Sequence, residues 1–167
     1  NNNLWIYREL YTKKVTADVF AQQVLNLEHK EYIRYGVLDS STWARRGDVG
    51  PSIAETMITA GCRWRPSDRS KGSRIAGKNE IHRRLQIDEF TEAPRLVFFN
   101  NCTNIISQLP IIPLDKNNAE DVDTNSEDHL YDALRYGTMT RPRSNLFDYN
   151  PETQRTGFQA ADATFGY

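Results

Sequence analysis

The order of strand, helix and strand in the first 38 residues most constrains the fold of this chain. Residues 4–11 are rich in aromatic and branched side chains and predict a strand. Thr16 can cap a helix that extends to about Leu27, and residues 32–38 predict a second strand. A strand, a helix and a strand in succession are typical of a crossover connection, so the sequence predicts an α/β sheet.

Asp39 directly follows the second predicted strand. Binding sites in open α/β sheets gather at the carboxyl ends of strands, which makes this carboxylate a candidate site residue. Three hydroxyl residues, Ser40, Ser41 and Thr42, come next, and an aspartate in that setting is also typical of a turn or a helix cap. The local pattern favours the cap, and it leaves both interpretations open.

Further elements are predicted along the rest of the chain. They are a helix from Pro51 or Ser52 to Gly61, a helix carrying Ile81 and Leu85, a strand over 95–99 and a helix over 102–109. Beyond Thr140 the sequence is polar and lacks apolar periodicity. We therefore expect a domain over residues 1–140 and an extended or disordered tail over residues 141–167.

An acidic helix is predicted around residues 127–137. Thr124 and Glu127 have the spacing of a capping box, and apolar side chains recur at helical spacing from Leu130 onward. Asp128 and Asp132 would then share one face, with His129 beside them. Either this is a solvated acidic face, or the carboxylates hold Mg²⁺ or Mn²⁺, which prefer oxygen ligands. A histidine in this place can bind metal, carry a proton or simply donate a hydrogen bond.

The net charge of −1 conceals two oppositely charged segments. Residues 63–84 hold eight Lys and Arg against two acids, and residues 115–132 hold seven acids against one lysine. A basic segment that contacts phosphates and an acidic one that binds cations would suit a nucleic-acid enzyme, although two solvated faces explain the charges equally well. The candidate DNA-binding residues are those of the glycine-punctuated basic loop over 67–78: Arg69, Lys71, Arg74 and Lys78.

Other features narrow the functional classes. Gly72 and Gly77 do not form a phosphate-binding P-loop, because Asn79 stands where that motif requires Ser or Thr. No apolar run approaches the roughly 20 residues of a membrane span. Cys62 and Cys102 are the only cysteines and lack metal-ligand spacing, which indicates reduced thiols in a cytosolic protein.

Several segments, taken in order, resemble one known family. They are residues 7–11 (YRELY), 36–41 (GVLDSS), 72–77 (GSRIAG), 121–124 (DVDT) and 127–137 (EDHLYDALRYG). Together they resemble the C-terminal nuclease domain of the large terminase subunit of tailed bacteriophages, over roughly Leu4 to Gly137.

The resemblance implies a ribonuclease-H-like fold, in which helices flank a mixed sheet. It implies an endonuclease that cuts concatemeric double-stranded viral DNA with two Mg²⁺ or Mn²⁺ ions. On this basis Asp39, Asp128 and Asp132 would be metal ligands, and His129 would join them in catalysis. The expected partners are DNA, an upstream ATPase domain, the small terminase subunit and the portal, in the cytoplasm of the bacterial host.

The chain departs from the family at its first strand. The aspartate that the family carries there has no counterpart, because the sequence aligns from the third strand onward. We therefore expect an N-terminally truncated nuclease domain with little or no activity alone. The competing hypotheses are a non-catalytic DNA-binding or portal-docking fragment and a cellular ribonuclease-H-like resolvase.

Overall fold

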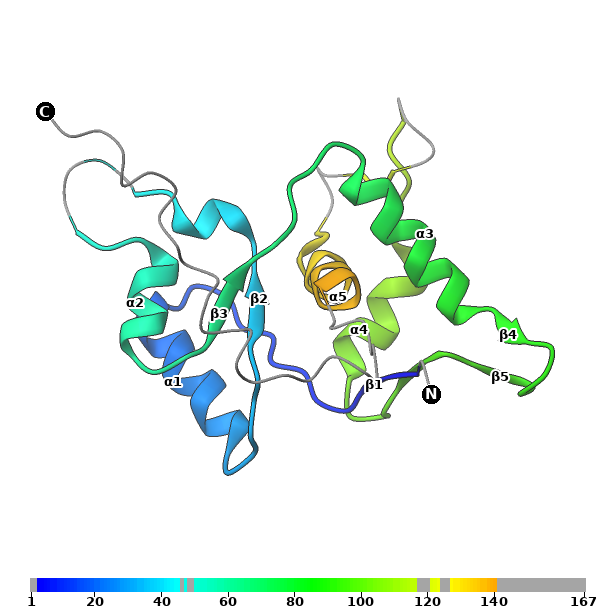
Figure 1. Ribbon diagram of the computed structural model, residues 1–167, viewed down its shortest axis with the longest axis horizontal. Coiled ribbons are helices and arrows are strands. Elements are labelled where there is room, and N and C mark those ends of the chain that lie inside the picture. Colours follow the sequence, from blue (N-terminus) through cyan, green and yellow to red (C-terminus); the bar gives the residue numbers. More distant parts are fainter. Residues whose placement is uncertain (1–2, 46, 48–49, 117–120, 124–126, 141–167) are drawn as a thin grey trace, which may run out of the picture.

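The computed structural model describes residues 3–45, 47, 50–116, 121–123 and 127–140, which form a mixed α/β structure (Figure 1). In chain order the elements are β1 (Leu4–Ile6), α1 (Ala17–Glu28), β2 (Gly36–Leu38), η1 (Ser40–Trp43), α2 (Ile53–Thr59), β3 (Trp64–Pro66), α3 (Ser73–Leu85), β4 (Ile87–Asp88), β5 (Ala93–Pro94), β6 (Leu96–Phe98), α4 (Thr103–Gln108), η2 (Leu109–Ile111) and α5 (His129–Thr140). None of these helices is long and apolar enough to cross a bilayer. The predicted tail, residues 141–167, lies outside the described residues.

The described strands pair two by two. β1 lies parallel to β6, with Leu4 opposite Leu96, and β2 lies parallel to β3, with Gly36 opposite Trp64. β4 and β5 form a short antiparallel hairpin. The predicted α/β class is confirmed, whereas the larger mixed sheet of a ribonuclease-H-like fold stays a prediction.

The first two strands are shorter than their sequence predicts, and after β1 the reason is that the following residues bond elsewhere. Tyr7 donates its hydroxyl to Glu31 at 2.7 Å, and Arg8 donates to Glu31 and to the carbonyl of Leu27. These contacts tie the chain after β1 to the end of α1. Residues 7–11, although rich in strand-forming side chains, therefore lie outside the ladder.

Glu9 lies in this segment and caps α4. Its carboxylate accepts hydrogen bonds from the backbone N–H groups of Asn104 at 2.8 Å and Ile105 at 3.1 Å. Burial opposes the charged form, but these hydrogen bonds outweigh it and lower the pKa of Glu9. The N-cap residue of α4, Cys102, makes no capping bond with its own side chain, and Glu9 instead accepts two of the free N–H groups at the start of this helix.

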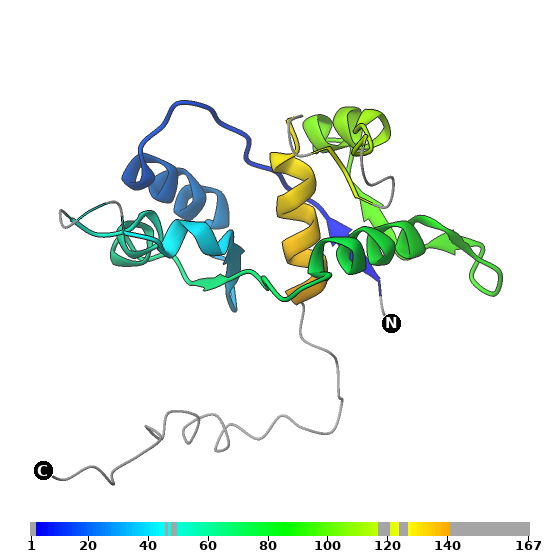
Figure 2. The same ribbon diagram turned by 90° about the horizontal axis from the view of Figure 1, so that it is seen from above.

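Two apolar clusters flank α5. The larger cluster joins α3, β6, α4 and α5 around Ile81, Leu96 and Tyr131. The smaller one is built on Ala21, Met57 and Cys62 and joins α1 and α2 to the β2–β3 pair. Figures 1 and 2 both show α5 between these two groups of elements, and it contacts β2 on one side and α3 and α4 on the other.

Helix α2 begins as its sequence predicts. The Ser52 hydroxyl accepts the N–H of Glu55 at 3.1 Å, and the Glu55 carboxylate accepts the N–H of Ser52 at 2.7 Å, which completes a capping box. The helix ends at Thr59, slightly earlier than predicted, and Gly61 follows with a φ of +115°.

The basic segment is helical over half of its length, which corrects the prediction of a loop over residues 67–78. Gly72, with a φ of +86°, occupies the N-cap position, and α3 begins at Ser73. Arg74 and Lys78 therefore lie one turn apart on a helix. Gly77 lies inside the same helix, where packing against α5 compensates for its low helix propensity.

The acidic helix α5 begins at His129, so Asp128 precedes it and does not lie within it. The Asp128 carbonyl accepts the N–H of Asp132 at 2.8 Å, which is the bond of an N-cap residue. Asp128 and Asp132 still lie on the same side, because the Arg74 guanidinium is 3.8 Å from a carboxylate oxygen of each. Thr124, the predicted capping residue, lies outside the described residues.

Gly77 sets how closely α3 approaches α5. A Cβ at this position would lie 2.5 Å from Cγ and 2.8 Å from Cδ of Arg135. Those atoms belong to the stem of a side chain that is only 5% exposed, so they cannot move aside freely. Glycine is the residue that lets the two helices make this contact.

We expect Gly77→Ala to lower the free energy of unfolding by about 1–3 kcal/mol, because it overpacks this contact. Gly137→Ala is the matched control, since a Cβ there lies in the interior of α5 and meets no neighbouring atom of the described residues within 4 Å. That control should raise the free energy of unfolding by about 0.5–1 kcal/mol through helix propensity. Urea denaturation of both variants measures the difference, and equal changes would contradict the proposed tight contact.

Candidate functional site

A polar pocket of about 440 Å³ opens beside α5. Its walls are the end of β2, the turn over residues 67–72, the first turn of α3, Asp121 and the first two turns of α5. The pocket thus lies at the carboxyl ends of the parallel strands β2 and β3, where sites of α/β proteins commonly form.

Two hydroxyl residues join the ends of these strands and fix the chain at Asp39. The Ser40 hydroxyl donates to the carbonyl of Ser67 at 2.6 Å, and the Ser40 N–H donates to the Ser67 hydroxyl at 3.1 Å. Asp39 itself accepts the N–H of Ser41 at 2.7 Å and caps η1. Asp39 is therefore a cap, as the local pattern favours, and it also lines the pocket, while its function as a site residue stays a prediction.

The carboxylates of Asp39 and Asp132 both approach the hydroxyl of Tyr136. This oxygen lies 3.0 Å from Oδ2 of Asp39 and 3.3 Å from Oδ2 of Asp132. One hydroxyl carries one proton, so it donates to only one carboxylate at a time. Two of the three expected metal ligands, Asp39 and Asp132, therefore lie on either side of the Tyr136 hydroxyl, and the sharing of a metal by all three stays a prediction.

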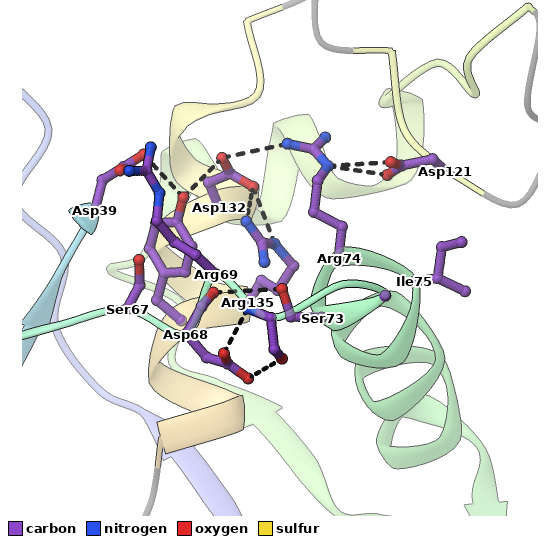
Figure 3. Close-up of a pocket in the computed structure, with 13 residues that line it drawn as sticks. Asp39, Ser67, Asp68, Arg69, Ser73, Arg74, Ile75, Asp121, Asp132 and Arg135 are labelled. Atoms are coloured by element: carbon purple, nitrogen blue, oxygen red, sulfur yellow. Dashed lines mark hydrogen bonds and ion pairs between the residues drawn. The ribbon is translucent and has the colours of Figure 1, made fainter. Parts of the chain in front are cut away.

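Arg74 lies among the acids on the other side of Asp132 (Figure 3). Its Nε is 3.1 Å from Oδ2 of Asp121, and its two terminal nitrogens are each 3.8 Å from a carboxylate oxygen, one of Asp128 and one of Asp132. Arg135, which is nearly buried, donates to Oδ1 of Asp132 at 2.9 Å. The carboxylates of the pocket are thus compensated by arginines of α3 and α5.

Burial, hydrogen bonds and neighbouring charges shift three pKa values in and beside the pocket. Burial raises the pKa of Tyr136 to about 12, with Asp132 and Asp39 acting in the same direction, so the hydroxyl stays protonated at neutral pH. Burial also opposes ionisation of Asp39, but hydrogen bonds from Ser41 and Tyr136 and the charge of Arg69 lower its pKa below the ordinary value. Burial raises the pKa of Asp128, and the charge of Asp132 raises it further.

The predicted site residues do not all line the polar pocket. Asp39, Asp132, Arg69 and Arg74 line the pocket, and Asp128 contacts it through Arg74. The side chain of His129 is 83% exposed, and its Nδ1 lies 3.9 Å from Asp128, so its predicted part in catalysis stays a prediction.

Two predicted DNA-binding lysines lie apart from the pocket lining. Lys71 is exposed in the turn before α3. Lys78 is buried and lines a second, apolar cavity, because the segment that carries it is helical. The sequence hypothesis assigned no function to Tyr136 or Arg135, although both lie within one turn of Asp132 along a predicted helix, and that spacing was the available signal.

The donor chemistry of the pocket fits a hard divalent cation. Carboxylate oxygens are the ligands that Mg²⁺ and Mn²⁺ prefer, and Mg²⁺ commonly binds one or two carboxylates together with water and substrate phosphates. Within the part of the chain that the structure describes, no three acidic, histidine or cysteine side chains form a metal-binding group. Asp39 and Asp132 are the residues that could supply oxygen ligands to an ion, and the binding of one or two ions stays a prediction.

Comparison of the chain with models of known protein families, with curated proteins and with solved structures gave no match.

We expect Asp128→Asn to raise the free energy of unfolding at pH 7 and to leave it unchanged near pH 3. The raised pKa means that the folded protein holds this proton more tightly than the unfolded chain. The cost of ionising Asp128 is therefore absent below the unfolded pKa and grows as pH rises through the folded pKa. The substitution removes that cost, and urea denaturation at the two pH values measures it.

Asp18→Asn serves as the matched control, because Asp18 is a surface acid on α1 whose pKa is lowered by a hydrogen bond from Thr16. This control should reduce stability slightly at pH 7. A loss of stability in Asp128→Asn at pH 7 would contradict the assignment of Asp128 as a destabilised carboxylate.

Proposed function

We propose that this protein is a divalent-cation-dependent endonuclease that hydrolyses phosphodiester bonds of double-stranded DNA at the polar pocket. One observation carries the proposal. The carboxylates of Asp39 and Asp132 both lie within hydrogen-bonding distance of the Tyr136 hydroxyl, in a pocket that Arg69 and Arg74 also line. Paired carboxylates next to arginines suit a reaction in which a cation and a phosphate must lie side by side.

Asp39 and Asp132 would hold the ion. When bound, Mg²⁺ or Mn²⁺ would supply an activated water and stabilise charge on the leaving oxygen. Tyr136 keeps its proton at neutral pH, so it can donate to either carboxylate and hold both side chains in the pocket. Asp39 stays ionised and so can bind the cation, because its pKa is lowered.

The basic residues would position the DNA backbone without reading its sequence. Arg69 lines the pocket and Lys71 is exposed beside it. The N-terminus of α3 adds the positive end of a helix dipole on the same side, since the first turn of α3 lines the pocket. Contacts of this kind go to phosphates and fix the register of the duplex.

The finer assignment rests on the sequence resemblance. It makes the chain part of the large terminase subunit of a tailed bacteriophage, acting in the host cytoplasm with an upstream ATPase domain, the small subunit and the portal. A cellular resolvase of the same fold would use the same pocket. A non-catalytic DNA-binding or portal-docking fragment is favoured by one specific observation, namely that Arg74 forms ion pairs with Asp121, Asp128 and Asp132.

We expect slow nicking of supercoiled plasmid by the wild-type chain in Mn²⁺, lost in EDTA. Asp132→Asn and Asp39→Asn should each reduce the rate by about 100-fold or more, because loss of a ligand exceeds the 10–100-fold typical of outer-shell partners. Asp18→Asn, an isosteric change of an acid on α1, should leave it unchanged.

Binding of Mn²⁺, followed by paramagnetic broadening of the amide signals of Asp39 and Asp132, separates catalysis from metal binding. Broadening without nicking would support the non-catalytic alternative. Nicking that survives Asp132→Asn would place the active site elsewhere.

We expect DNA binding in EDTA to weaken with salt and to tolerate any sequence. Arg69→Ala and Lys71→Ala should each reduce the slope of log K against log salt by about 0.9, the contribution of one phosphate contact. Lys30→Ala, a change of an exposed lysine after α1, is the control and should leave the slope as it is. A fluorescence anisotropy titration at several salt concentrations gives the slopes, and equal slopes for all variants would make the basic turn a solvated surface only.

A further inference from the structure

The β4–β5 hairpin presents an almost fully exposed aromatic side chain. Phe90, in the loop of this hairpin, is 96% exposed, and Ile87 in β4 is 70% exposed. Figures 1 and 2 both show the hairpin extending beyond the end of α3, away from α5. An aromatic side chain buries about 150–250 Å² when it is covered, so a partner that covers Phe90 gains a large stabilisation.

The hairpin loop holds Phe90 in place before any partner binds. The Asp88 carboxylate accepts the backbone N–H of Phe90 at 3.1 Å and that of Thr91 at 3.2 Å, and Arg95 also donates to it. The Glu92 N–H donates to the Asp88 carbonyl at 2.8 Å and closes the loop. A loop that is ordered by its own hydrogen bonds loses little conformational entropy on binding, which favours affinity.

The charges next to Phe90 indicate which kind of partner can cover it. Glu89 and Glu92 lie on either side of it in the loop, and both are exposed. Their negative charge repels DNA phosphates and anionic lipid headgroups. The hairpin therefore suits a protein surface that is apolar and free of acidic side chains.

The same chain carries a surface of this kind. A cavity of about 490 Å³ lies between α3, β6, η2 and α5, and the described residues that line it include no Asp or Glu. Its walls are mainly apolar and partly open to solvent, since Leu85 is 38% and Ile106 44% exposed. His82, which is exposed and also lines the cavity, can donate an N–H to a carboxylate in either protonation state.

We propose that the chain forms a dimer in which the β4–β5 hairpin of each copy inserts Phe90 into the apolar cavity of the other. Within one chain this contact is not made, because Phe90 is exposed. The insertion brings Glu89 and Glu92 to a surface that offers them a donor, His82. The proposal does not depend on the nuclease activity, because the cavity shares no lining residue with the polar pocket.

The area that is covered favours two reciprocal contacts over one. A single inserted Phe90 and the walls around it would bury about 300–500 Å², twice the area of one aromatic side chain. Small specific interfaces bury about 1,200 Å², so one such contact is not enough. Two contacts double the area and bring it toward that size, which favours a closed dimer with two-fold symmetry.

Sedimentation equilibrium of the full chain over a range of concentrations tests the proposal. The wild type should show a concentration-dependent equilibrium between monomer and dimer. Phe90→Ser should weaken the dimer about 100-fold or more, because each dimer loses two buried aromatic side chains and each is typically worth tenfold or more at the centre of an interface. Tyr32→Ser, a change of an aromatic side chain that is 83% exposed, is the matched control and should leave the association unchanged. A wild type that stays monomeric at every concentration, or equal association of the wild type and Phe90→Ser, would overturn the proposal.

A mixture of two variants shows whether the hairpin enters the cavity. Ile106→Glu, a change at the exposed rim on α4, brings an acid close to Glu89 and Glu92 and should weaken its own dimer by a similar factor. A mixture of Phe90→Ser and Ile106→Glu retains one intact hairpin that faces one intact cavity. The mixed dimer should therefore be about 10-fold tighter than the dimer of either variant alone. Unchanged association of Ile106→Glu, or a mixture that associates no better than its components, would overturn the proposal, because the hairpins would then contact something other than the cavity.

Discussion

The close contact of α3 with α5 at Gly77 is the constraint on which the candidate site depends. The absent side chain of Gly77 admits the stem of Arg135, whose guanidinium is thereby buried. A buried arginine must be paired, because an unpaired buried charge is strongly destabilising. Asp132 provides the partner at 2.9 Å. The packing of two helices thus fixes the orientation of the carboxylate that the pocket is built around.

The same contact explains how several acids can lie close together. α3 brings Arg74 to Asp121, Asp128 and Asp132 at the point where α5 begins. The compensation is incomplete, because the pKa of Asp128 remains raised. Retaining a carboxylate at a cost to stability is typical of functional sites, where the charge serves a ligand and not the fold.

The sequence predicted those features of the fold and site that depend on neighbouring residues. The start of α2 at Ser52 and the cap formed by Asp39 involve residues at most three positions apart. The extents of the strands were not predictable in this way, because residues 7–11 leave the ladder to bond with Glu31, Leu27 and Asn104. Lys78 was assigned to DNA as part of a loop, and its burial follows from the helix that this segment forms.

In the proposed function, cation and DNA must bind cooperatively at this pocket. Arg74 contributes the positive charge that the acids need while no cation is bound. A cation between Asp39 and Asp132 would add a like charge near Arg74, and the resulting repulsion would favour release of this guanidinium from the acids. One terminal nitrogen of Arg74 already lacks a hydrogen-bond partner among the described residues, so a phosphate oxygen is an acceptor that it can use. If phosphate draws Arg74 away and so strengthens cation binding, the cation must strengthen phosphate binding by the same factor, because the coupling of two ligands is reciprocal. Arg74 is then the residue through which substrate and cation promote each other's binding.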